Sequence, residues 1–326
     1  MLAAVPGSES TARPTAEFRH QGPHFAQHLM ANFGCHALRK PVVTTTAPIP
    51  PIPPIPLVRR RRLVVMLFAP VLALVCLSPG VLAEPQSASN PAGLDWQALG
   101  NFSIARTETT IGQFRRFADA TRIVTQAERT GGGLVYEAGW VQKPGWHWRS
   151  PWGGSGPTSD SEPAVHLTFD EAQGFCRWAG GQLPTDAQWL SAAYTEQRAA
   201  PAPLFTRGST YRFPTGNTPE GAQCLDDCGD AAQTRAVRHG VKLWRGRGHA
   251  LAGSTPAGVN GLHEMGGNAW EWVDEPPGVA GQVERRTRGG SWWYGAAQMR
   301  ADHLQSKPPE TTAVYIGFRC VRRRPE

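Results

Sequence analysis

The segment Gly261–Trp272, with the sequence GLHEMGGNAWEW, gathers the residue types that most clearly suggest chemistry: two carboxylates, two tryptophans and a Gly-Gly-Asn turn. The glycines and Asn268 permit a tight or left-handed turn, and Ala269–Val273 alternates as a strand does. Glu264 and Glu271 can therefore converge across the turn. Carboxylates and free backbone carbonyls are oxygen ligands of the kind that calcium takes. A turn with two solvated acids is the simpler interpretation of the same spacing.

The basic charge of the chain does not extend to its tryptophan-rich part. The 326 residues have a formal net charge of +7, and all 12 tryptophans follow residue 83. From Glu84 onward, 25 Lys and Arg residues face 24 Asp and Glu residues, so the basic excess lies in the leader. This distribution argues against a polybasic face for nucleic acid.

The first 83 residues differ in composition from the rest. Residues 1–57 form a low-complexity, proline-rich leader without the periodic apolar content of a packed domain. Residues 58–83 have the layout of a secretory signal peptide: the basic run Arg59–Arg62, the apolar run Leu63–Leu77 and small residues before Glu84. A retained membrane anchor is the alternative for the apolar run.

Because a signal peptide begins at the initiator, we expect a mis-assigned start, with the true one near Val58. We expect a periplasmic or secreted protein with no stable membrane span after cleavage. A linker over 84–94 then leads to one folded domain over 95–326.

Export changes the interpretation of the cysteines. The mature part contains four of them: Cys176, Cys224, Cys228 and Cys320. An even number in an oxidising compartment favours two disulfides. Cys224 and Cys228 most simply close a small local loop, which leaves Cys176 to pair with Cys320. A four-cysteine zinc site is the alternative, but it normally shows two close pairs.

Three helices have recognisable starts. Thr110 can cap a helix with one apolar side, and capping boxes begin at Thr168 and at Thr185. From Ala199 to Gly258 there is little periodicity, and a lone histidine there, such as His249, is expected on the surface. The Gly- and Pro-rich stretch 131–163 is expected to be a long loop whose tryptophans either bind a sugar or peptide or fold back over the core. These tryptophans are Trp140, Trp146, Trp148 and Trp152.

Five ordered segments resemble the sulfatase-modifying-factor family, whose best-known members are the formylglycine-generating enzymes. They are the helix opening at 107–117, PAVHLTFDEAQGFCRWAGGQLPTDAQW at 163–189, GLHEMGGNAWEW at 261–272, RGGSW at 288–292 and GFRC at 317–320. The resemblance covers Asp95–Arg322. It implies a single domain with an α+β, irregular, loop-rich fold akin to C-type lectins, and a disulfide between Cys176 and Cys320.

The resemblance also implies two metals. Calcium would be held by the side chains of Glu264 and Glu271 and by the carbonyls of Gly267 and Ala269, although Glu264 stands where the family usually has Asn or Asp. The two copper-binding cysteines of the family align with Tyr294 and Met299. Copper(I) requires soft thiolates, so we expect neither copper at these two positions nor formylglycine formation by that mechanism.

The residues after Gly289 form the remaining candidate site. Ser291 corresponds to a pocket-lining position of the family, and the segment Ser291–Tyr294 is expected as a strand. The candidate catalytic residues are Ser291, Tyr294 and His303. The candidate substrate-binding residues are Trp146, Trp148, Trp293 and Arg300.

Two functions are compatible with these residues. The first is an exported, divergent oxidoreductase or maturation factor that acts on a peptide-derived or other small substrate. The second is a noncatalytic, lectin-like module that binds a glycan, a peptide or a partner protein, because a fold alone does not decide function.

Overall fold

The computed structural model describes most of the tryptophan-rich part of the chain. The described residues are 90–154, 158–229, 243, 245, 247–275 and 283–324. The expected leader at 1–57 and the expected signal peptide at 58–83 lie outside them. Within the described ranges, no helix has both the length and the apolar character needed to cross a bilayer.

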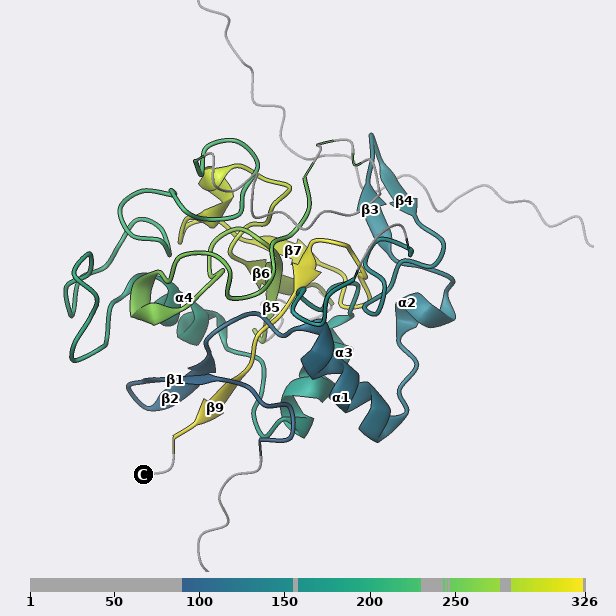
Figure 1. Cartoon of the computed structure of the whole chain (residues 1–326), viewed down its shortest axis with the longest axis horizontal. Coiled ribbons are helices and arrows are strands. Elements are labelled where there is room, and N and C mark those ends of the chain that lie inside the picture. Colours follow the sequence, from purple (N-terminus) through teal and green to yellow (C-terminus); the bar gives the residue numbers. More distant parts are fainter. Residues whose placement is uncertain are drawn as a thin grey trace, which may run out of the picture. The chain divides into compact units, whose positions relative to one another are not determined.

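The described residues form three sheets. One sheet combines strands from the two ends of the domain sequence, and another lies within the tryptophan-rich stretch. The first contains β1 (Trp96–Leu99), β2 (Phe102–Ala105) and β9 (Val321–Arg323), and β2 pairs antiparallel with both neighbours. The second is the hairpin of β3 (Leu134–Tyr136) and β4 (Trp140–Gln142). This hairpin stands apart at the upper right of Figure 1. The expected loop therefore contains a regular element.

The third sheet has four strands in the order β7-β6-β5-β8. The strands are β5 (Trp270–Val273), β6 (Arg285–Arg288), β7 (Gln305–Lys307) and β8 (Ile316–Gly317). β5 pairs antiparallel with β6 and parallel with β8. Every residue of β5 is buried, so the strand has no solvated face, and Glu271 is 1% exposed.

The three predicted helix starts are confirmed. The helices α1 (Ile111–Thr121), α3 (Phe169–Trp178) and α4 (Asp186–Tyr194) begin after Thr110, Thr168 and Thr185. The side chain of each threonine accepts a hydrogen bond from the backbone N–H of the third helical residue. The side chain of that third residue accepts a hydrogen bond from the backbone N–H of the threonine, which completes a capping box. The short elements are α2 (Gln126–Arg129) and the 3₁₀ turns η1 (Val259–Gly261) and η2 (Ala296–Met299).

Helices α1 and α3 form the core together with the chain that leads into β9. The rings of Phe114 and Phe175 lie 5.8 Å apart, and that of Phe175 lies 5.4 Å from Phe318. Cys176 and Cys320 form a disulfide beside these rings, and Cys224 and Cys228 form the second. The described residues therefore make one loop-rich α+β domain with the predicted disulfides.

Two local predictions are wrong. Ser291–Tyr294 is a turn and not a strand, because Gly289 and Gly290 adopt φ values of 98° and 75° and the N–H of Tyr294 bonds back to the carbonyl of Ser291. His249 is fully buried and not on the surface, with its Nε2 2.7 Å from a carboxylate oxygen of Glu162.

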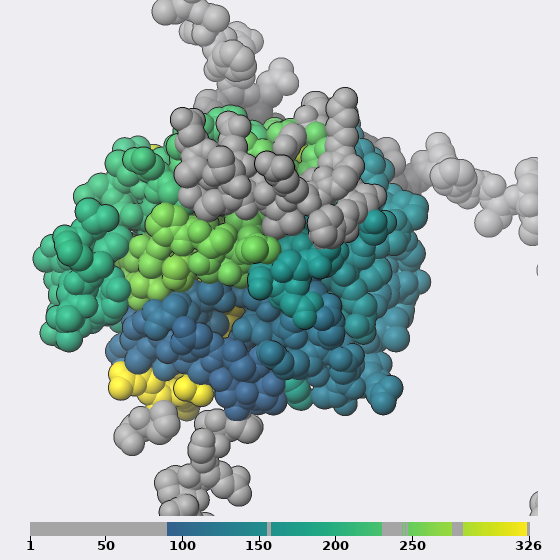
Figure 2. Space-filling model, in the orientation of Figure 1, coloured from purple at the N-terminus to yellow at the C-terminus, as the bar shows by residue number. Residues whose placement is uncertain are grey.

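Long-range contacts join the start of the domain to the 250–265 region. Arg106 donates to the carbonyl of Gly261 at 3.1 Å, and the N–H of His263 donates to the carbonyl of Arg106 at 2.9 Å. Figure 2 shows the two regions side by side, in blue and light green. The turn before β5 is thus fixed by residues far away in the sequence.

Candidate functional site

Glu271, a predicted calcium ligand, is neutralised by the guanidinium of Arg319. Three contacts of 2.6 to 2.9 Å join Nε and Nη2 of Arg319 to the two carboxylate oxygens, and both side chains are at most 1% exposed. The indole Nε1 of Trp189 donates to the same carboxylate at 2.7 Å. Protein donors therefore occupy both oxygens of Glu271.

Glu264 is held in the same manner by a neighbouring loop. Its carboxylate accepts the N–H of Gly253 at 2.8 Å and both the N–H and the hydroxyl of Thr255, at 3.0 and 2.8 Å. Its backbone adopts a left-handed φ of 53°. Because both carboxylates are already satisfied and Glu271 has a cationic partner, the predicted ligand set of Glu264, Gly267, Ala269 and Glu271 does not fit a calcium ion.

A third carboxylate, Glu108, lies close to this charged group. It accepts hydrogen bonds from Asn268 Nδ2 and from the N–H of Ala269, at 2.5 and 2.9 Å. Burial, with the negative charges of Glu264 and Glu271, raises the pKa of Glu108 well above its ordinary value. These contacts anchor the Gly-Gly-Asn turn to the chain before α1.

The turn Ser291–Tyr294 is positioned by the Gly-Gly-Asn turn. The carbonyl of Gly289 accepts the N–H of Gly267, and the carbonyl of Asn268 accepts the N–H of Trp292. Ser291 is 1% exposed, and its hydroxyl accepts the N–H of Trp293 at 3.3 Å. Within the described residues, no hydrogen bond joins this hydroxyl to His303. The geometry therefore gives Ser291 a structural contact rather than a base partner.

Tyr294 and His303 both contact Trp270. The ring of Tyr294 lies 5.6 Å from that of Trp270 and 6.1 Å from that of Tyr315, and His303 stacks on Trp270 at 6.0 Å. Trp293 stacks on Tyr315 at 6.2 Å. Strand β5, the turn and the chain before β8 thus supply one set of rings.

The β3–β4 hairpin extends this set to the surface. Trp140 lies 6.0 Å from Tyr315 and 5.7 Å from Tyr136, and the ammonium of Lys307 lies 5.7 Å from the Trp140 ring. Trp140 is 47% exposed and Tyr136 is 39% exposed. We call the full group the aromatic cluster: Tyr136, Trp140, Trp270, Trp293, Tyr294, His303 and Tyr315. The sequence analysis did not identify Tyr136 and Tyr315 as site residues. It did not predict the β3–β4 hairpin, which contains Tyr136 and brings Trp140 to Tyr315. The short alternating segments 134–136 and 140–142 could have indicated this hairpin.

Partial burial sets the protonation of the cluster. Burial lowers the pKa of His303, the positive charge of Arg288 adds to this effect, and Asp302 opposes it. Burial also lowers the pKa of Lys307. Burial and a hydrogen bond with Tyr294 raise the pKa of the Tyr315 phenol. The lowered pKa favours the neutral form of the His303 imidazole.

The other predicted binding residues lie elsewhere or are inaccessible. Trp146 and Trp148 are 6% and 0% exposed and belong to the core, so the interpretation of rings folded over the core is the one that agrees with the structure. Trp293 is 2% exposed, so its ring lies in the interior of the cluster and offers no surface to a ligand. Arg300 is partly exposed and pairs with Asp302 at 3.0 Å.

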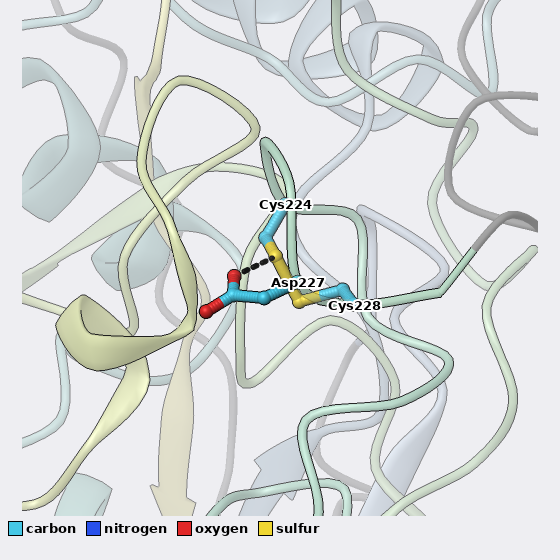
Figure 3. A group of neighbouring side chains, drawn as sticks. All are labelled: Cys224, Asp227 and Cys228. Carbon is cyan, nitrogen blue, oxygen red and sulfur yellow. Dashed lines mark hydrogen bonds between the residues drawn. A yellow bond between two sulfur atoms is a disulfide. The ribbon is translucent and has the colours of Figure 1, made fainter. Parts of the chain in front are cut away.

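The positions aligned with the copper-binding cysteines do not form a metal site by themselves. Tyr294 offers a phenol, and the thioether of Met299 is fully buried against the Cys224–Cys228 disulfide. Among the described residues, the single group of nearby potential ligands comprises Cys224, Asp227 and Cys228, shown in Figure 3, and its cysteines are bonded to each other. Tyr294 and Met299 therefore do not fit copper as a pair.

The domain thus has a loop-rich α+β fold, and its candidate site includes the turn Ser291–Tyr294 that follows Gly289 and Gly290. Residues 73–324 match the family model described as "Sulfatase-modifying factor enzyme 1-like domain", and the chain belongs to this family.

Individual relatives are named for different enzyme activities. A formylglycine-generating enzyme of Thermomonospora curvata is 26% identical over 278 residues, covering 68% of this chain and 82% of the relative. A hercynine oxygenase of Mycolicibacterium smegmatis is 26% identical over 275 residues, covering 75% of this chain but only 58% of the relative. The solved structure of PvdO from Pseudomonas aeruginosa covers 68% of this chain and 80% of its own, with 18% identity and a TM-score of 0.47.

Proposed function

We propose that this domain binds a peptide-derived or other small substrate at the aromatic cluster and acts on it as a divergent oxidoreductase or maturation factor. The observation that supports the proposal is the partly exposed set of rings around Tyr294 and His303. Relatives named for the generation of formylglycine and for the oxygenation of hercynine support a reaction of the oxidoreductase class. The proposed reaction does not use the family's thiolate pair, because Tyr294 and Met299 occupy the two aligned positions.

The cluster has distinct roles to offer a bound molecule. Trp140 and Tyr136 provide exposed ring faces that can stack on an apolar or planar group. The lowered pKa of His303 favours its neutral imidazole, which can accept a proton. Tyr294 supplies a phenol hydrogen-bonded to Tyr315, and its ring packs on Trp270, as the His303 ring does. Binding and proton transfer are therefore available on one surface.

Turnover of defined probes tests this proposal. The full chain would be given a cysteine-containing peptide or hercynine in air, with oxygen consumption and product mass measured beside binding. We expect Trp140→Ala to weaken binding, and His303→Gln to lower the turnover rate with little loss of binding. Leu204→Ala changes an apolar side chain that is 85% exposed and outside the cluster, and serves as the control.

The possible results separate the two function classes. Probe binding that requires Trp140 but proceeds without oxygen consumption or a product would support the noncatalytic binding module. This alternative is supported by the Ser291 hydroxyl, whose contact within the described residues is with the N–H of Trp293 and not with a base. Binding that is unaffected by Trp140→Ala would refute the site itself.

Export is the second part of the proposal. The supporting observation is the signal-peptide layout of residues 58–83. Mass mapping of the protein recovered from its native cells should give an N-terminus near Glu84, and the periplasmic or secreted fraction should contain it. Recovery of peptides from residues 1–57 would refute the mis-assigned start.

A further inference from the structure

Three consecutive arginines, Arg322–Arg324, line a groove of about 570 Å³ beside the first sheet. Its other walls are the turn between β1 and β2 and the residues Gln182 and Gln188. β9 is an edge strand of this sheet, and Figure 1 shows it, in yellow, on the outer side of β2. We call this hollow the arginine groove. It shares no lining residue with the aromatic cluster.

The arginine groove has an excess of positive charge. Cζ of Arg322 lies 4.6 Å from the ring centroid of Trp96, and Arg324 donates to the carbonyl of Gly100 at 3.0 Å. Arg323 and Arg324 are exposed, and Arg322 is partly exposed. Within the described part of the chain, none of the three arginines has an ion-pair partner, and no Asp or Glu lines the groove. These charges therefore attract a negatively charged ligand.

The backbone of β9 offers hydrogen bonds at the same place. Along an antiparallel strand, every second residue directs its N–H and carbonyl to one neighbour, and the residues between direct theirs to the other side. The N–H of Arg324 donates to the carbonyl of Asn101, so residue 324 faces the β1–β2 turn. Val321 faces away from β2, because its N–H and carbonyl exchange two hydrogen bonds of 2.8 Å with Gln182. Arg323 has the orientation of Val321, so its N–H and carbonyl face the outer edge, where no described residue pairs with them.

We propose that the arginine groove binds an extended peptide segment rich in Asp or Glu, which pairs with the free edge of β9. Such a segment supplies the acceptor and the donor that the N–H and the carbonyl of Arg323 require, and it continues the edge beyond Gln182. Its carboxylates pair with the arginine side chains, because a guanidinium can donate two parallel hydrogen bonds to one carboxylate.

The free carbonyl of Arg323 distinguishes a peptide from a nucleic acid. A phosphodiester oxygen can accept the N–H of Arg323, but the phosphodiester has no donor for the carbonyl, whose oxygen repels the anion. A peptide satisfies both backbone groups and can also carry the negative charge. The groove therefore favours an acidic peptide over a phosphate backbone.

The arginines also decide which strands can pair with β9. Charged side chains on an edge strand protect a protein against pairing with other copies of itself. A second copy of β9 would place arginines opposite arginines, and like charges directly opposite each other are destabilising. A strand with carboxylates at these positions meets the opposite charge. The groove therefore selects against self-association and for an acidic partner.

A neighbouring hollow lengthens the binding surface. It has a volume of about 640 Å³ and shares Gly100 and Arg324 with the arginine groove. In its wall, Arg198 pairs with Glu196 at 2.8 Å. Arg207 is exposed there and has no ion-pair partner among the described residues. A peptide that extends past the contact with β9 therefore meets a further cation.

This inference goes beyond the proposed function and does not rest on it. Peptide binding at the arginine groove is measured without turnover and needs no residue of the aromatic cluster. Trp140→Ala should therefore leave binding at the groove unchanged, although it should weaken binding at the cluster. Failure of one proposal leaves the other intact.

Fluorescence anisotropy with a defined peptide tests the inference. The probe is the acetylated peptide Val-Glu-Val-Glu-Val-Glu-Val with an uncharged fluorophore, titrated with the full chain. We expect saturable binding that weakens as salt is added, because exposed charges are screened. A matched peptide with Gln in place of each Glu should bind about tenfold more weakly or worse, since the charged contacts with arginine are lost.

Charge reversal locates the site on the protein. Arg323→Glu combined with Arg324→Glu should weaken binding by about tenfold or more, because like charges then oppose each other. Arg122→Glu combined with Arg212→Glu makes the same change in net charge at two exposed residues outside both hollows, and should have little effect. Circular dichroism would verify that both double variants are folded.

N-methylation of the peptide tests the backbone pairing with the protein unchanged. Methylating one amide at a time removes one N–H donor and leaves every carboxylate in place. At one position we expect a loss of about tenfold, because the carbonyl of Arg323 then has no donor. Equal affinity for every methylated peptide would refute the pairing with β9.

Three other results would overturn the inference. They are the absence of saturable binding, an affinity unchanged by reversal of Arg323 and Arg324, and displacement of the probe by an oligonucleotide of equal charge as effectively as by the unlabelled peptide. In the last case the groove would be a general anion-binding surface.

Discussion

At the scale of single residues, the buried ion pair with Arg319 gives Glu271, a predicted calcium ligand, a cationic partner from the protein itself. Arg319 comes 48 residues after Glu271, and it also donates to the carbonyls of Ala105, Arg106 and His263. The guanidinium thus joins three segments around one carboxylate. Nothing in the spacing of the GLHEMGGNAWEW segment could reveal this distant partner.

Loss of Arg319 should be strongly destabilising. Arg319→Met leaves the Glu271 carboxylate buried without its cation, which costs about 3–5 kcal/mol of unfolding free energy. Urea denaturation at pH 7 measures the loss. The double variant with Glu271→Gln should recover part of it, because the uncompensated charge is removed. Strictly additive losses in the two single variants would contradict the pairing.

Calcium should leave the stability of the domain unchanged. A ligand that binds only the folded state at 100 times its Kd adds about 2.7 kcal/mol to the unfolding free energy. Because Arg319 already neutralises Glu271, we expect equal urea midpoints in millimolar calcium and in excess chelator. A higher midpoint in calcium that disappears in Glu264→Gln would show that the predicted ligands bind the ion after all.

At the scale of elements, one glutamate connects two helix starts. Oε2 of Glu171 accepts the N–H of Thr168 in its own capping box, and Oε1 accepts the N–H of Gln126 at the start of α2. The two bonds measure 2.9 and 2.6 Å. The side chain therefore fixes α2 against α3 while it caps α3.

The two roles of Glu171 can be separated by substitution. Thr168→Ala removes one cap of α3 and should cost about 1 kcal/mol, whereas Glu171→Ala loses bonds to both helices and should cost roughly 2 kcal/mol. Thr110→Ala, at the start of α1, is a matched control for a simple cap. Chemical denaturation should place Glu171→Ala below both threonine variants, and equal midpoints would refute the double role.

The features that the sequence predicts correctly are those that depend on residues close together in the chain. Capping boxes are local, so the starts at Thr110, Thr168 and Thr185 were predictable. Counting cysteines and noting their spacing sufficed for the disulfides. The aromatic cluster was only partly predictable: Tyr294, His303 and Trp293 follow one motif, but their contact with Trp140 depends on a hairpin and on the position of β8. Burial of Trp146, Trp148 and His249 is likewise set by tertiary packing.

At the scale of the whole molecule, stability depends on a histidine enclosed between distant segments. His166 is fully buried, with Nε2 3.0 Å from the carbonyl of Pro151 and its ring 6.1 Å from that of Trp146. Burial lowers the pKa of His166 to about 4, although hydrogen bonds with the backbone of Pro151 and Thr312 oppose this shift. The folded domain therefore excludes a proton that the unfolded chain accepts.

This difference predicts a loss of stability in mild acid. Between pH of about 6.5 and about 4, the unfolded state binds a proton at His166 and the folded state does not, so stability falls as pH falls. From about pH 7.5 to about pH 5 the contribution is roughly 2 kcal/mol. His166→Asn, which tolerates the left-handed φ of 60°, should show a smaller decrease in urea denaturation. An equal decrease in both proteins would assign the effect to other groups.

The antiparallel pairing of β2 with β9 also imposes an order on assembly. β2 pairs with the neighbouring β1 on one edge, but on its other edge Phe102, Ser103 and Ile104 pair with Val321–Arg323. Cys176 likewise pairs with Cys320, 144 residues later. As a chain leaves the ribosome with its N-terminal part first, β1 and β2 can pair early, but their sheet is completed only when nearly the whole domain has emerged. The long-range disulfide can therefore close only after almost the whole domain sequence is available, because Cys320 directly precedes β9.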